Sequence, residues 1–122
     1  MKSIYVIIVA SVISFSAYSQ TWTNPMILTD EWPLYSIGDP FVMKFNGCYY
    51  LYCSTRDSET GIKCWSSKDL VTWTYRGLCA TDAITKAAYA PEVIYWNGTF
   101  YMYTSPAGNG HYVLSSANPT GP

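Results

Sequence analysis

Residues 38–55 read GDPFVMKFNGCYYLYCST, and this stretch decides the fold. It contains Asp39, then a short apolar run, an Asn-Gly pair at 46 and 47, and an aromatic run. Asn-Gly between two apolar runs is the strongest short-range signal of a β-hairpin, because a type I′ turn needs positive φ at both central residues. The stretch therefore predicts two antiparallel strands, 41–45 and 48–55, with an acidic residue just ahead of the first.

The same plan returns 51 residues later in residues 89–106, which read YAPEVIYWNGTFYMYTSP. Both copies place a proline near the start of the first strand, Asn-Gly at the turn and Tyr-x-Tyr in the second strand. A self-similar β unit of this period is typical of a propeller blade. The two copies differ at one chemically important position, because Asp39 of the first corresponds to Ala90 of the second.

Two further strands, 62–67 and 71–78, complete the first unit, and residues 79–90 connect it to the second, with a helical turn or plain loop at 83–88. The second unit shows only three strands, predicted at 92–96, 99–105 and 112–116. We therefore expect an all-β fold, a partial β-propeller of about two four-stranded antiparallel blades with the second incomplete. Blade 1 is expected at about 39–79 and blade 2 at about 90–122.

The strands of the first hairpin are apolar on both faces, which fits a blade packed between two neighbours. Fewer than three repeats rarely bury enough surface for stability. Two open, aromatic blade faces and an unpaired edge strand would favour aggregation. We interpret the sequence as the N-terminal portion of a longer propeller.

The first 19 residues have the pattern of a secretory signal peptide. Lys2 precedes an apolar run at 4–13, and polar and small residues follow up to Ser19. The run is shorter than the roughly 20 apolar residues that a membrane-spanning helix needs. We expect cleavage after Ser19 and an exported protein, periplasmic or extracellular; an uncleaved anchor or a buried helix is the alternative.

The amino-acid composition limits the kinds of partner that the protein is expected to bind. The net charge is −1, so there is no basic patch for nucleic acid and no basic amphipathic face for a membrane. The chain carries 12 Tyr and 5 Trp, which suit a β-rich core, and exposed members would suit stacking on sugar rings. His111 is the only histidine and no Cys-x-x-Cys pair exists, which argues against a zinc site.

Four cysteines lie close together in the sequence, at positions 48, 53, 64 and 79. An oxidising compartment permits disulfides, and four cysteines allow three pairings. If segments 48–55 and 62–68 pair around the loop at 56–61, Cys53 faces Cys64 closely enough to bond. Free buried thiols are the alternative.

The ordered series of motifs resembles glycoside hydrolase family 43, the five-bladed β-propellers that act on arabinofuranosides and xylosides. The resemblance runs from about residue 34 to residue 122. It is carried by Gly-Asp-Pro-Phe at 38–41, Trp-Ser-Ser-Lys-Asp-Leu at 65–70, Ala-Pro-Glu-Val at 90–93 and the two Asn-Gly hairpins.

The resemblance implies that Asp39 is the general base of an inverting glycosidase. In such enzymes one carboxylate activates water while a second protonates the leaving oxygen. The family takes that acid, a Glu, and a third carboxylate that tunes its pKa from later blades, so this chain is expected to be inactive alone. The alternative for Asp39 is a strand-start or turn carboxylate with no catalytic role.

Two further residues are candidate substrate contacts. Tyr89 stands where the family often has Trp, and it could stack on a sugar ring. Glu92 begins the adjacent strand; a structural or sugar-contacting role is expected for it rather than catalysis. No cofactor is implied. Some relatives carry calcium, but no ligands for it are identifiable in this sequence.

The leading hypothesis is hydrolysis of O-glycosyl bonds in arabinose- or xylose-containing plant polysaccharides or oligosaccharides by an inverting mechanism. A non-catalytic carbohydrate-binding propeller is one alternative, and a non-functional truncated product is another.

Overall fold

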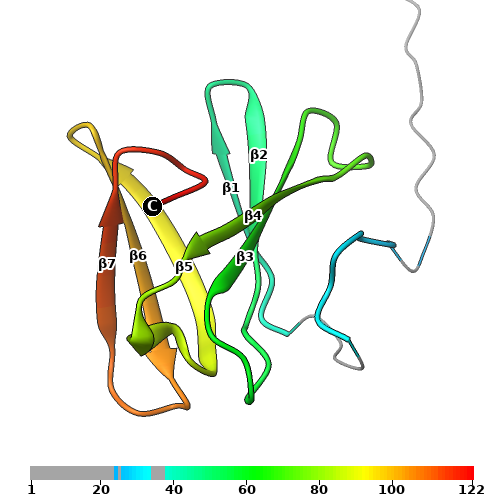
Figure 1. The fold of residues 1–122 in the computed structure, drawn as a ribbon. Helices are drawn as coiled ribbons and strands as arrows, with labels where there is room; N and C mark the ends of the chain where they lie inside the picture. The colour runs from blue at the N-terminus through cyan, green and yellow to red at the C-terminus, as the bar shows by residue number, and fades with distance from the viewer. Residues whose placement is uncertain (1–23, 25, 34–37) are drawn as a thin grey trace, which may run out of the picture.

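Two antiparallel sheets make up the computed structural model, which describes residues 24, 26–33 and 38–122. The first sheet has the strand order β1-β2-β3-β4 and the second β5-β6-β7 (Figure 1). The strands are β1 (Phe41–Phe45), β2 (Cys48–Tyr52), β3 (Ile62–Ser67), β4 (Thr74–Ala80), β5 (Ala88–Trp96), β6 (Thr99–Pro106) and β7 (Tyr112–Ser116). The fold is a partial β-propeller, as the sequence predicts. The predicted signal peptide lies outside the described residues.

Each sheet is a meander whose first hairpin turns at Asn-Gly. Asn46 and Asn97 both have a φ of 47°, and the glycine that follows each also has a positive φ. These are the values that a type I′ turn requires, so the local sequence sets both hairpins. A one-turn 3-10 helix, η1 (Ala83–Thr85), joins the sheets. No helix within the described residues is long and apolar enough to cross a membrane.

Three predicted strand boundaries shift by three residues or more. β2 ends at Tyr52 because the backbone N–H groups of Ser54 and Thr55 donate to carbonyl groups outside β1 and β3. β4 begins at Thr74 because Asp69 organises the preceding turn, accepting hydrogen bonds from the backbone N–H groups of Val71 and Thr72. β5 begins at Ala88 and bulges between Tyr89 and Glu92. The bulge places Ala90 outside the ladder, where its backbone can bond to another element.

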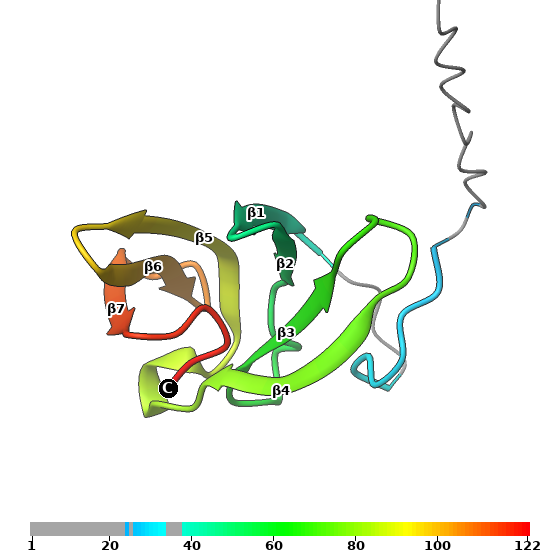
Figure 2. The ribbon, with the colours of Figure 1, turned by 90° about the horizontal axis from the view of Figure 1, so that it is seen from above.

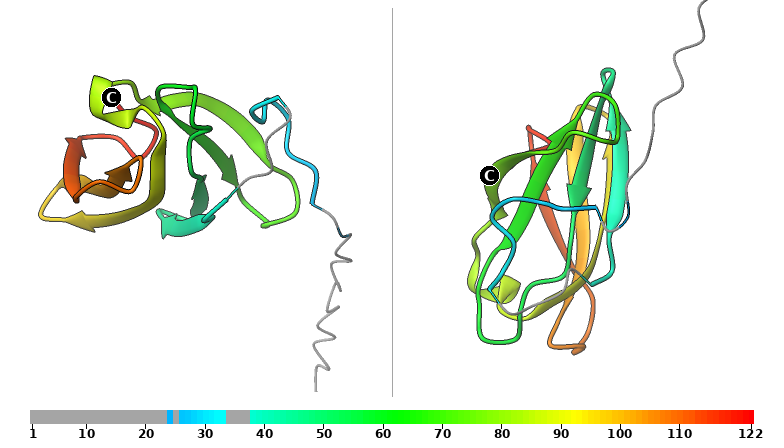
Figure 3. Two further views of the ribbon diagram at one scale, coloured as in Figure 1. Left: turned by 90° about the horizontal axis from the view of Figure 1, so that it is seen from below. Right: turned by 90° about the vertical axis from the view of Figure 1, so that its right-hand side faces the viewer.

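The two sheets pack face to face, like adjacent blades (Figures 2 and 3). Tyr52, Ile62 and Cys64 from the first sheet contact Val93 and Met102 from the second in one buried cluster. At one end of this interface three rings meet: Phe45, Tyr95 and Phe100 have centroid separations of 4.6 to 4.9 Å. Burial of these apolar side chains holds the sheets together.

The opposite face of the second sheet is open. Val93 points to the first sheet and is 4% exposed, whereas Ile94, its neighbour along the strand, points away and is 46% exposed. This open face corresponds, by the 51-residue repeat, to the face that the first sheet buries. Its members are Glu92, Ile94, Trp96, Tyr101, Tyr103 and Val113.

Part of the outer face of the first sheet, by contrast, is covered. Leu28 is buried there against Leu51, Cys53 and Trp65. The Trp65 indole N–H donates to the backbone oxygen of Thr29 at 2.8 Å. The segment at 26–33 forms no helix or strand, but it shields this face. The expectation that the first sheet has an open outer face is therefore wrong for this part of the face, whereas Val42, on the same face, is 44% exposed.

The conditional Cys53–Cys64 bond does not form, and the alternative of free thiols holds. Cys64 lies opposite Tyr52, one residue away from the predicted register. Because side chains alternate between faces, Cys64 joins the cluster between the sheets and Cys53 joins the outer cluster. All four cysteines are free thiols.

Candidate functional site

The strands β1 and β5 start at the same end of the molecule (Figure 1). Just ahead of β1 stands Asp39, with a φ of 47°, and at the matching position of the second sheet stands Ala90, with a φ of 48°. Non-glycine residues seldom adopt this left-handed conformation, and its recurrence at equivalent positions confirms the structural repeat. The side chain of Asp39 is exposed at this end of the sheets.

Ser54 connects these two positions. Its hydroxyl donates to Oδ2 of Asp39 at 2.7 Å, and its Oγ accepts from the backbone N–H of Ala90 at 2.9 Å. Its own backbone N–H donates to the carbonyl of Gly38 at 3.0 Å. Next to it, the backbone N–H of Thr55 donates to the carbonyl of Ala88 at 2.7 Å. The residues that follow β2 therefore hydrogen-bond to the starts of both β1 and β5.

Tyr89 lies beside this junction and contacts an acidic residue that the sequence analysis did not single out. Its hydroxyl donates to Oδ1 of Asp57 at 2.6 Å, and its backbone oxygen accepts from the Thr104 hydroxyl at 2.9 Å. Asp57 belongs to the β2–β3 loop, which leaves the sheet at the same end as Asp39. Tyr89 is half-buried, and it is fixed at its hydroxyl and at its backbone oxygen.

Glu92 is placed differently. It is exposed and lies opposite Tyr103 in the β5–β6 ladder, on the open face of the second sheet. Among the described residues no hydrogen bond links Glu92 to Asp39. His111 is exposed between β6 and β7. Across residues 24, 26–33 and 38–122, no three His, Cys, Asp or Glu side chains cluster as metal ligands would.

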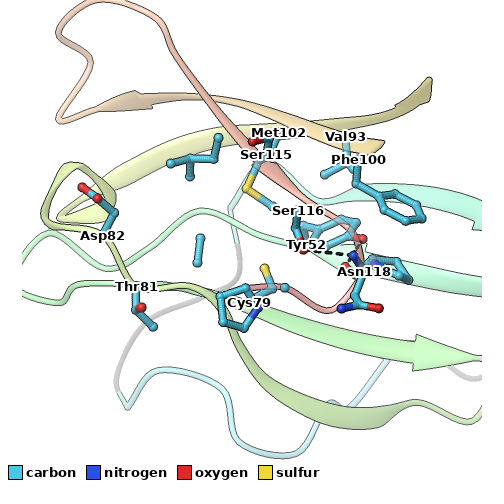
Figure 4. A pocket seen from close by; sticks show the side chains of 15 residues that line it. Tyr52, Cys79, Thr81, Asp82, Val93, Phe100, Met102, Ser115, Ser116 and Asn118 are labelled. Atoms are coloured by element: carbon cyan, nitrogen blue, oxygen red, sulfur yellow. Dashed lines mark hydrogen bonds between the residues drawn. The ribbon is translucent and has the colours of Figure 1, made fainter. Parts of the chain in front are cut away.

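A pocket lies elsewhere, between the sheets and against the C-terminal segment (Figure 4). It has a volume of about 290 Å³ and is lined by apolar side chains such as Phe100 and Met102. The Tyr52 hydroxyl crosses it to donate to the Pro119 carbonyl at 2.6 Å. Asp39, Tyr89 and Glu92 do not line it, so we assign it to packing between elements rather than to the candidate site.

Two of the predicted site residues, Asp39 and Tyr89, thus stand at one end of the sheets, and Glu92 belongs to another face. Sequence reasoning missed Ser54 and Asp57. The repeat gives one usable signal for Ser54, because it matches Ser105, but nothing in the sequence shows that its hydroxyl reaches Asp39.

Comparison with known proteins assigns the family. The sequence profile of glycosyl hydrolases family 43 matches residues 24–122. The chain is 31% identical over 121 residues to the non-reducing end alpha-L-arabinofuranosidase BoGH43B of Bacteroides ovatus, covering 88% of this chain and 22% of that protein. It is 27% identical over 93 residues to a xylosidase/arabinosidase of Butyrivibrio fibrisolvens, covering 69% of this chain and 18% of that protein.

The fold comparison agrees. The crystal structure of a thermostable family-43 glycoside hydrolase superposes with a TM-score of 0.63 at 34% identity, covering 83% of this chain and 34% of that one. The chain therefore spans about a fifth of the length of the curated relatives and a third of that structure. Profile, relatives and fold all lead to one conclusion: the chain belongs to glycosyl hydrolases family 43.

Proposed function

We propose that the protein containing this chain is an exported, inverting glycosidase in which Asp39 is the general base. The observation that carries the proposal is the placement of Asp39. Its carboxylate is exposed at the end of the sheets, and one of its oxygens is held by a buried hydroxyl. A general base needs both an accessible oxygen and a fixed orientation toward the water that it deprotonates.

In the proposed reaction, Asp39 takes a proton from a water molecule as the water oxygen attacks the anomeric carbon. A second carboxyl group, on the opposite side of the sugar, gives its proton to the leaving oxygen. The two groups stand about 6.5–9.5 Å apart in inverting enzymes, which leaves room for the water. The family resemblance implies that this acid and its tuning carboxylate come from parts of the fold that this sequence does not span. We therefore expect no turnover from the 122-residue chain by itself.

The proposed substrates are arabinose- or xylose-containing plant polysaccharides and their oligosaccharides. Support comes from the names of the two relatives, an arabinofuranosidase and a xylosidase/arabinosidase. Tyr89 is proposed to contact the sugar, because it lies at the same end of the sheets as Asp39 and Asp57 fixes its hydroxyl while Thr104 fixes its backbone oxygen. Glu92, on the open face of the second sheet, is proposed to contact substrate only at a distance from the cleaved bond.

The experiment uses the protein made from the complete reading frame that contains this sequence. Aryl α-L-arabinofuranosides, aryl β-D-xylosides and arabinan are offered separately, and the first product anomer is followed by proton NMR. Release of the inverted pentose anomer supports the proposal. Binding of these sugars without release would support a carbohydrate-binding propeller instead. A retained anomeric configuration would contradict the assigned mechanism.

A further inference from the structure

The Ser54 side chain is buried, with 2% of its surface exposed, yet its hydroxyl has a partner on each side. One partner is Oδ2 of Asp39 and the other is the backbone N–H of Ala90. A serine hydroxyl has one proton to donate and lone pairs with which to accept. The contacts therefore make a chain from the second sheet, through Ser54, to the carboxylate at the head of the first.

The direction of this chain is fixed by chemistry. The backbone N–H of Ala90 can only donate, so Ser54 Oγ must act as the acceptor toward it. The single hydroxyl proton is then directed at Asp39, which must accept it on Oδ2. Such an arrangement favours a carboxylate with one oxygen already occupied, and it leaves Oδ1 as the oxygen without this partner.

The backbone fixes the same geometry. Ser54 N–H holds the carbonyl of Gly38, the residue directly before Asp39. The bulge in β5 frees the N–H of Ala90 from the ladder, so that it is available to Ser54. Ser54 is thus fastened to both sheets, and a change in their relative position would move the carboxylate as well.

We propose that Ser54 is a positioning residue: it holds Oδ2 of Asp39 and leaves Oδ1 to accept the proton of the attacking water. The proposal rests on the proposed function of Asp39. It assigns a separate task to each carboxylate oxygen and makes the orientation of the base depend on the contact between the two sheets.

The test compares three variants in the complete protein. Ser54→Ala removes the hydroxyl, and Ser54→Thr retains it. Ser105→Ala is the matched control, because Ser105 holds the equivalent position of the second sheet, where Ala90 replaces the acidic residue. We expect Ser54→Ala to lower kcat by about 10- to 100-fold with KM within about twofold, since it removes a hydrogen bond to a charged group. Ser54→Thr should recover most of this loss, and Ser105→Ala should leave kcat within about twofold.

A kcat of Ser54→Ala within about twofold of the wild-type value would overturn the proposal. Equal losses in Ser54→Ala and Ser105→Ala would overturn it too, because they would show a general effect of removing a serine there. Melting temperatures identify any variant that fails to fold. In that case Ser54→Cys, which is nearly isosteric but a weak donor, replaces Ser54→Ala with the same criteria.

A second measurement separates this proposal from the proposed function. Unfolding of Ser54→Ala, Asp39→Ala and the double variant gives a double-mutant cycle that does not depend on activity, because alanine at position 39 removes the oxygen that accepts from Ser54. Non-additive effects support the Ser54–Asp39 contact even if the wild-type protein hydrolyses nothing. Additive effects would show that Ser54 and Asp39 do not interact and would overturn the positioning role. The proposed hydrolysis is tested separately by product release.

Discussion

Asp39 and Ala90 occupy the same position in two successive sheets and share one backbone conformation, with φ values of 47° and 48°. Ser54 contacts both, through the Asp39 carboxylate and the Ala90 N–H. The scaffold therefore repeats, and the chemistry does not. A left-handed strand start belongs to the architecture, whereas the carboxylate is found in the first sheet alone among the described residues.

The conformation of Ala90 leads to a stability prediction. A left-handed φ costs a residue with a Cβ about 1–2 kcal/mol, and glycine avoids that cost but gains entropy in the unfolded chain. Ala90→Gly should therefore raise the free energy of unfolding by about 0.5–1 kcal/mol in urea titration. Ala88→Gly, two residues earlier in a buried strand position without positive φ, should lower it by about 1 kcal/mol or more. A loss of stability in Ala90→Gly would contradict the assigned strain.

The sequence was sufficient for the hairpins and the repeat, because Asn-Gly turns and apolar runs act locally. Strands 41–45, 62–67 and 112–116 match their predicted bounds. The register between β2 and β3 was not predictable, since a single residue gained or lost in the long loop at 53–61 reverses the faces. The contacts of Ser54 were not predictable either, because they depend on how the second sheet packs against the first. The packing of residues 26–33 on the first sheet is likewise a long-range contact that no local pattern indicates.

The cysteines should react unequally. Burial raises the pKa of the Cys53 thiol to about 12, and a hydrogen bond with Cys64 that favours the protonated Cys79 thiol, together with burial, raises the pKa of Cys79. Because the thiolate is the reactive form, both should resist alkylation at pH 8. We expect iodoacetamide to modify half-buried Cys48 first in the native protein, and four cysteines after unfolding without reductant. A native mass lower by two hydrogen atoms, together with unreactive Cys53 and Cys64, would indicate a disulfide between them. That result would contradict the observed register.

The Asp69 carboxylate should make the stability of the fold depend on pH in the acidic range. Backbone N–H groups of Thr72 and Val71 and the Ser67 hydroxyl donate to its carboxylate and lower its pKa to about 2. A depressed folded-state pKa stabilises the fold above the unfolded value of about 3.9, and this contribution is lost as pH falls toward 2. Asp69→Asn should therefore melt at a lower temperature than the wild type above pH 4. The two melting curves should converge as pH approaches 2; a constant difference would exclude this cause.

The C-terminal segment packs too closely to tolerate a side chain at Gly121. A Cβ built there would lie 1.7 Å from the carbonyl oxygen of Cys79. Gly98 also has a positive φ, but a Cβ there meets nothing within 4 Å. Both substitutions to alanine incur backbone strain. We expect Gly121→Ala to lower the free energy of unfolding more than Gly98→Ala, because only Gly121→Ala adds a steric clash. Equal losses would show that the segment does not pack against Cys79.

The central claim is that Asp39 is the base, and replacing its carboxylate tests it most directly. Asp39→Asn keeps the shape, and asparagine tolerates positive φ, so the fold is expected to survive. Asp82→Asn is the control, since asparagine can still cap η1 through its side-chain oxygen. In the complete protein, kcat for arabinoside or xyloside hydrolysis should fall by about 10²–10⁴-fold in Asp39→Asn, with KM little changed, and stay near the wild-type value in Asp82→Asn. A kcat of Asp39→Asn within about twofold of the wild-type value would contradict the account.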